Sequence, residues 1–203
     1  MSGHLSVATL ACVLVFACAK SDPSDPAFIA KDLRDRSAQE IHDAADKFTF
    51  DVPEGQRLTE RQLADYVRVV KLAERIRAAV AVRGSNPGEV IASARSYATA
   101  ELRACLNLGL NPKEHEWAAT QIRWAASAAD RLEALDDEVA AAKAALDAES
   151  DRFRAARKQE AYDRAVEARE RWRDSLDSAL LANAQLVRTH RPELTEAFPV
   201  DAH

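Results

Sequence analysis

The chain has 203 residues, of which 47% are hydrophobic, 30% charged and only 6% aromatic, and its formal net charge is −5. Few aromatic residues and only five glycines disfavour a β-sheet protein and favour an all-α fold. Acidic and basic residues are interspersed, so no one-sided basic face is available to neutralise a phosphate backbone, and we exclude nucleic acid as a partner.

The N-terminus has the features of an export signal. Residues 1–19 contain no Lys, Arg, Asp or Glu, and the apolar run over 5–17 is too short to anchor the chain across a bilayer. Residues 15–18 (VFAC) resemble a bacterial lipobox, in which cleavage precedes the cysteine and the cysteine is acylated. This resemblance implies a signal peptide over 1–17, lipidation at Cys18 and a membrane-anchored lipoprotein of the bacterial envelope.

Two other interpretations of this segment stay open. Residues 17–19 (ACA) also fit a secretory cleavage site, and a cut after Ala19 would release a soluble periplasmic or secreted chain that begins at Lys20. Alternatively, residues 5–18 form a buried helix of the folded domain.

A tether and a short helix are expected next. Residues 18–36 comprise the lipid-anchor cysteine and a flexible segment with two prolines among Ser and Asp. Ser37 and Glu40 form a capping-box pattern that predicts a helix from 38 to about 48. Residues 49–58 contain Pro and Gly and are predicted to be a loop.

A second helix is predicted from Thr59 to about Arg83. Gln62 lies three residues after Thr59, and apolar residues then follow at helical spacing. Gly84 is suited to end this helix, because glycine readily adopts the left-handed conformation that follows a helix terminus.

Two Asn-Pro pairs predict the third and fourth helices. Asn86 can cap a helix that starts at Pro87 and extends to about residue 108, and Asn111 can cap another that starts at Pro112. The short connections require these helices to pack as antiparallel neighbours.

Residues 113–191 contain neither Gly nor Pro and predict long helices. The apolar phase breaks between about 157 and 161, which indicates either a stutter in one rod or a turn between two helices. We expect two long charged helices over about 130–191, forming a C-terminal helical hairpin or a coiled-coil-like arm. Pro192 is predicted to end the last helix and residues 192–203 to form a tail, so that the helical domain spans 37–191 as a bundle of four to six helices.

No catalytic, cofactor or metal motif is present. The run 114–116 (EHE) lies in the first turn of a predicted helix, where adjacent side chains point about 100° apart and do not chelate together. We found no nucleophile motif and no Gly-rich phosphate loop. Cys105 lies in an apolar helical pattern and is predicted to be a buried core cysteine.

Three tryptophans are candidates for binding a partner. Trp117 and Trp124 are seven residues apart and share a helical face, and Trp172 lies in the charged C-terminal region. Tryptophan is enriched at interface hot spots, although burial in the core is the alternative for all three. The charged run 147–174 is either a solvated helix face or an arm that self-associates or engages another envelope protein.

Two segments, together with the N-terminal signal, resemble uncharacterised exported bacterial helical proteins, in which a T-x-x-Q helix precedes an L-x-P-x-E-x-x-W helix. The segments are LTERQLADYVRVVKLAERI and GLNPKEHEWAATQI. The matching residues are Thr59, Gln62, Tyr66, Leu110, Pro112, Glu114 and Trp117. The resemblance covers about a third of the chain and implies no particular activity.

The sequence therefore predicts an exported, lipid-anchored helical protein that acts as a structural or protein-interaction module of the envelope. The alternative is a small periplasmic ligand-binding protein or hydrolase with a pocket among the helices over 59–128. In that alternative Asp65, Tyr66, Glu74 and Arg75 could line the pocket, although exposed ion pairs explain the charged residues equally well.

Overall fold

The computed structural model describes residue 33 and residues 36–81 and 87–197, and within them the chain is all-α, as its composition predicts. The described elements are α2 (Ala38–Ala45), the 3₁₀ turn η2 (Glu54–Gln56), α3 (Glu60–Ala81), α4 (Pro87–Ala98), α5 (Ala100–Asn107), α6 (Pro112–Asp147), α7 (Arg152–Ser175), α8 (Ser178–Thr189) and α9 (Arg191–Ala197). The signal peptide over 1–17, Cys18, Gly84 and Asn86 lie outside the described residues.

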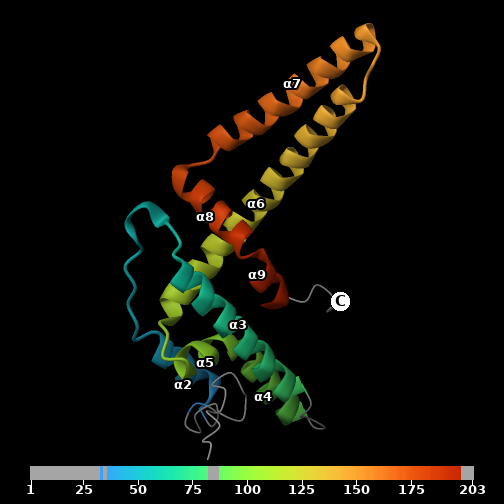
Figure 1. The fold of residues 1–203 in the computed structure, drawn as a ribbon. Helices are drawn as coiled ribbons and strands as arrows, with labels where there is room; N and C mark the ends of the chain where they lie inside the picture. The colour runs from blue at the N-terminus through green and yellow to red at the C-terminus, as the bar shows by residue number, and fades with distance from the viewer. Residues whose placement is uncertain (1–32, 34–35, 82–86, 198–203) are drawn as a thin grey trace, which may run out of the picture.

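The long helices α6 and α7 lie side by side and extend away from the shorter helices (Figure 1). At 1.5 Å per residue, the 36 residues of α6 span about 54 Å. Among the described helices, none is long and apolar enough to cross a membrane.

Local capping signals determine three of the helix starts. The Ser37 side chain accepts a hydrogen bond from the Glu40 backbone while the Glu40 carboxylate accepts one from Ser37. The side chain of Asn111 accepts from the backbone N–H groups of the first turn of α6, with proline at the start of the helix. Thr59 and Gln62 exchange equivalent bonds before α3, at 3.0 and 3.2 Å. Each such cap stabilises its helix by about 1 kcal/mol.

Two faces of α3 organise the core. One face packs with α2 and α5 in a cluster that includes Ile41, Val69, Leu72 and Cys105. The other face packs with α6, α8 and α9 in a second cluster. The buried residues of the second cluster are Leu58, Leu63, Tyr66, Val70, Ala118, Ile122, Ala125, Val187, Leu194 and Ala197.

A third, smaller cluster lies where the C-terminal end of α7 separates from α6. Ala128, Ala129 and Ala184 form its buried part, and Trp172 packs against them. The alanines let α6 and α8 approach closely at this point.

The buried guanidinium of Arg103 ties the N-terminal segment to α5. It donates to the backbone oxygens of Leu33 and Arg36, the latter at 2.8 Å, and to the Thr99 hydroxyl at 3.1 Å. Leu33 is itself buried in the first cluster. The described part of the segment over 18–36 is therefore packed against the domain.

The helix expected over 87–108 is interrupted at Thr99, where α4 ends and α5 begins. The Thr99 hydroxyl donates back to the carbonyls of Arg95 and Ser96, and its backbone has φ −97° and ψ 8°. This local bonding bends helices, and Arg103 holds the hydroxyl in place.

The chain reverses at residues 148–151, ahead of the phase break expected at 157–161. Asp151 caps α7 by accepting from the N–H groups of Phe153 and Arg154 at 2.9 and 3.0 Å. Asp177 caps α8 in the same way, so a second break follows at 176–177. The absence of Gly and Pro thus did not predict an unbroken helix, because at each break an aspartate caps the helix that follows.

The prediction that Pro192 ends the last helix was wrong. Pro192 lies in the first turn of α9, which continues to Ala197. Proline has no N–H to donate, but the first turn of a helix needs no such donor. Burial of Leu194 and Ala197 in the second core cluster holds α9 against the body.

Candidate functional site

A groove crosses the junction of α2, α3, α5 and α6, and it has a volume of about 570 Å³. Four side chains give this groove its chemistry: Tyr66 and Arg77 from α3, Glu101 from α5 and His115 from α6. The groove is also lined by His42 and by charged residues of both signs, namely Asp46, Lys113, Glu116 and Arg123.

Glu101 is the hub of the ionic contacts. Its Oε1 accepts a hydrogen bond from Arg77 Nη2 at 2.7 Å, and its Oε2 lies 3.5 Å from His115 Nε2. These neighbours lower the pKa of the Glu101 carboxyl to about 2; the His115 contact is the largest cause, and Arg77 adds to it against the opposing effect of burial. Glu101 is therefore ionised throughout the neutral range.

His115 is held between Glu101 and the ring of Tyr66. Its side chain is only 9% exposed, and its ring stacks on Tyr66 with centroids 5.4 Å apart and an interplanar angle of 23°. Within the described part of the chain, the buried Nε2 atom has no hydrogen-bond partner, since its approach to Glu101 is longer than an ordinary hydrogen bond.

Burial raises the pKa of the Tyr66 phenol to about 12, with the Glu101 charge as a further cause and Arg123 opposing it. The phenol therefore stays neutral at physiological pH. A neutral phenol is a hydrogen-bond donor and a poor base.

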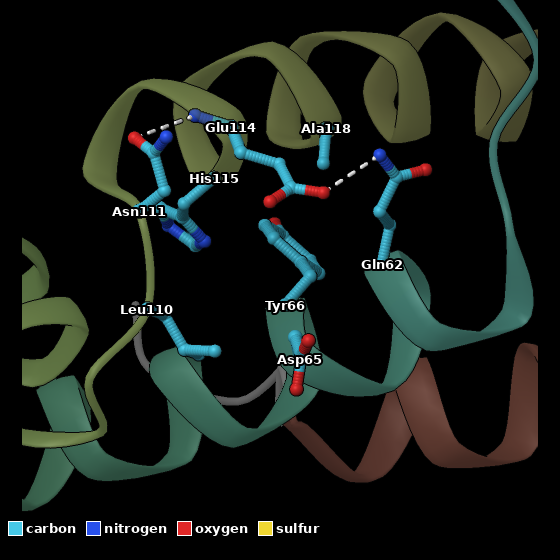
Figure 2. Close-up of a pocket in the computed structure, with 8 residues that line it drawn as sticks. All are labelled: Gln62, Asp65, Tyr66, Leu110, Asn111, Glu114, His115 and Ala118. Atoms are coloured by element: carbon cyan, nitrogen blue, oxygen red, sulfur yellow. Dashed lines mark hydrogen bonds between the residues drawn. The ribbon is translucent and has the colours of Figure 1, made fainter. Parts of the chain in front are cut away.

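A small cavity of about 20 Å³ lies on the other side of Tyr66 and His115, and Figure 2 shows the two rings between α3 and α6. The Glu114 carboxylate there accepts hydrogen bonds from Gln62 Nε2 at 2.9 Å and Arg61 Nη2 at 2.6 Å. Such a volume holds about one water molecule. The bonds of Glu114 thus join the first turns of α3 and α6.

The lining residues of the groove include polar and charged groups but no activated nucleophile. The nearby thiol of Cys105 is fully buried, and burial raises its pKa to about 12, with the Glu101 charge adding to the effect. A thiol in that state is inert. No cluster of three or more potential metal ligands occurs in the described ranges.

The three tryptophans occupy different environments. Trp117 packs against the second core cluster and against Phe50, with ring centroids 5.5 Å apart. Trp124 is 58% exposed, and Trp172 packs against the third cluster. The helical face shared by Trp117 and Trp124 is therefore partly covered at one end and open at the other.

Of the residues expected in the alternative pocket, Asp65 and Tyr66 line the small cavity, and only Tyr66 also lines the groove. Glu74 forms an ion pair with Arg77 on the same helix. Sequence reasoning missed Arg77 and Glu101, because they lie on different helices and no local pattern links them.

Comparison of the chain with protein-family models, curated proteins and solved structures found no match to any of them.

Proposed function

We propose that the protein is an exported, lipid-anchored interaction module of the bacterial envelope, in which a helical bundle carries the distal part of α6 and α7 as a binding arm. The export and lipidation parts of this proposal rest on residues 1–18 alone. The arm is defined as residues 136–171.

One observation carries the proposal: burial stops along α6 long before the helix does. Leu135 is the last buried residue of α6, although the helix continues to Asp147, and α7 contains no buried residue. The unburied part of α6 is about 18 Å long. Helix stability comes mainly from packing of an apolar face. A pair of helices that leaves its surface unburied over this length, as α6 and α7 do here, therefore favours contact with another protein.

The surface of the arm has the composition expected of such a contact region. Both signs of charge occur, and several pair within the arm, as Lys143 does with Asp147 and Lys158 with Glu149. Phe153, in the first turn of α7 at the tip, is 85% exposed. An exposed aromatic ring at the end of a charged hairpin suits an apolar socket on an envelope protein or on a second copy of this chain.

Photo-crosslinking in the native host tests this proposal. A photoreactive residue at Phe153 is expected to give a specific adduct that one at Val52, a 53% exposed hydrophobic position on the body, does not give. Adducts from neither position, or the same adducts from both, would count against an arm-centred interface. The mass of the adduct distinguishes a second copy from another protein.

The anchor requires a separate measurement, the mass of the N-terminal peptide of the mature protein. An acylated Cys18 in the membrane fraction is expected. An unmodified chain that begins at Lys20 in the soluble fraction would remove the anchor from the proposal and leave the arm untouched.

A second candidate function, binding of a small polar ligand, is favoured by the Tyr66–His115–Glu101 arrangement. A buried imidazole whose Nε2 has no hydrogen-bond partner among the described residues, beside a groove, is a typical feature of binding sites. A thermal-shift screen of polar metabolites tests it. A ligand that stabilises the wild type but neither His115→Ala nor Glu101→Gln supports this candidate, and a screen without such a ligand opposes it.

A further inference from the structure

A second, smaller cleft lies at the base of the arm, where α7 and α8 meet α6. It has a volume of about 250 Å³. Its apolar lining residues are Ala129, Leu132, Leu181 and Ala184, and its polar lining residues are Asp136, Arg169, Arg173, Gln185 and Arg188. The cleft is separate from the groove around His115, since the two share no lining residue.

The charges of this cleft are unbalanced. Arg169, Arg173 and Arg188 face a single carboxylate, that of Asp136, so the lining has an excess of two positive charges. Guanidinium groups stay protonated at any physiological pH, so the excess is permanent. Glu170 approaches Arg169 from outside the lining, at 3.9 Å, and its side chain is 62% exposed. A contact so long and so exposed compensates little of the charge.

Asp136 is shared between two of the arginines. Its Oδ2 accepts a hydrogen bond from Arg188 Nη1 at 3.1 Å, and its Oδ1 lies 3.6 Å from Arg169 Nη1. With the residues that the structure describes, the side chain of Arg173 makes no ion pair or hydrogen bond. Arg173 is four residues after Arg169 on α7, a spacing at which like charges repel. The arrangement thus carries an electrostatic cost that a bound anion would remove.

We infer that this cleft binds a phosphate monoester, with the phosphate among Arg169, Arg173 and Arg188 and the ester carbons against Leu132 and Leu181. A phosphate monoester carries a charge of about −1.5 to −2 at pH 7, which matches the excess, whereas a carboxylate would neutralise only half of it. The planar guanidinium presents paired donors that match phosphate oxygens. Leu132 and Leu181, both half-buried, provide a surface for a short hydrocarbon chain.

Binding there would also bear on the arm. Arg169 and Arg173 lie in the last turns of α7, and Arg188 lies on α8. A single bound phosphate would therefore link the C-terminal end of α7 to α8. The inference does not depend on the proposed function, because it concerns residues at the base of the arm and no partner at its tip.

Isothermal titration calorimetry of the full mature protein at low ionic strength tests the inference, with butyl phosphate, inorganic phosphate and butyrate as probes. Saturable binding of butyl phosphate is expected, tighter than that of butyrate. The variant Arg173→Gln is expected to bind butyl phosphate at least about tenfold more weakly, the effect of losing one charge-assisted hydrogen bond.

Arg171→Gln is the matched control, since Arg171 lies on α7 two residues away, is 72% exposed and pairs with Glu167 instead. Equal weakening by both variants, equal affinity for butyrate and butyl phosphate, or no saturable binding would overturn the inference. Both arginines are exposed, so circular dichroism of the variants should match the wild type.

Vesicles then separate the two sources of such a phosphate. If the ligand is a lipid headgroup, the wild type should bind vesicles that contain phosphatidic acid, and Arg173→Gln should not. Binding of butyl phosphate in solution without binding to these vesicles would identify a soluble ester instead. Phosphatidylcholine vesicles are the control for non-specific adsorption.

Discussion

The side chain of Asn183, buried in α8, accepts a hydrogen bond from the backbone N–H of Leu58 at 2.8 Å. Its amide nitrogen donates in turn to the Gln56 carbonyl at 3.1 Å. One buried side chain thus fixes the end of the loop before α3 to a helix that is 125 positions further along the chain. Because the loop feeds directly into α3, this contact helps to position the helix that supplies Tyr66 and Arg77.

Asn183→Ala should destabilise the protein by roughly 1–3 kcal/mol, since it leaves the Leu58 N–H buried without an acceptor. The free energy of unfolding in urea measures this. Gln185→Ala, at an exposed position of the same helix, is the control and should change stability by less than about 0.5 kcal/mol. Similar losses in both variants would show that the Asn183 bonds contribute little.

Two leucines on α6 should respond differently to truncation. Leu135 is 2% exposed at the end of the packed part of α6, so Leu135→Ala should cost roughly 2–5 kcal/mol. The same change at Leu146, which is half-buried near the tip of the arm, should reduce the stability of the protein by less than about 1.5 kcal/mol. Chemical denaturation of the two variants provides the comparison. A larger loss at Leu146 would contradict the boundary that we place after Leu135.

Acid should weaken the contribution of Glu101 to stability. The folded-state pKa of this carboxyl, about 2, lies below its ordinary value of 4.5. The unfolded state therefore binds the proton first, and the stabilisation is present above pH 4.5 and is lost as the pH falls towards 2. The side chain is 45% exposed, so after discounting for solvent screening we expect about 1 kcal/mol.

The difference in unfolding free energy between wild type and Glu101→Gln isolates this effect from the other carboxylates. It should be largest above pH 4.5 and shrink steadily below it. A difference that stays constant from pH 6 to pH 2.5 would show that the Arg77 and His115 contacts do not favour the ionised form.

Cys105 should resist alkylation in the native protein. The thiol is fully buried, and burial raises its pKa to about 12, so almost no thiolate is present or accessible at pH 8. Iodoacetamide labelling, followed by mass analysis of the peptide that contains Cys105, should give slow modification in buffer and rapid modification in 6 M urea. Equally fast labelling under both conditions would place the thiol at the surface.

Much of the local structure follows from short-range patterns. The starts of α2, α3 and α6 were predicted correctly because each cap depends on hydrogen bonds within three residues, as between Ser37 and Glu40. Burial of Cys105 was also predicted correctly, since it follows from the apolar periodicity around it. The caps at Asp151 and Asp177 are equally local, and attention to aspartate would have revealed them.

The sequence by itself thus determined the all-α class, the principal helix starts and the buried thiol, because these depend on composition, spacing and neighbours along the chain. Tertiary structure alone decided that Arg77, Glu101 and His115 meet in one groove and that Arg173 and Arg188 line one cleft. These groups come from different helices, and their meeting depends on which helix faces pack together. That packing depends on the burial of many apolar side chains from all parts of the chain, so it cannot be predicted from any short stretch of sequence.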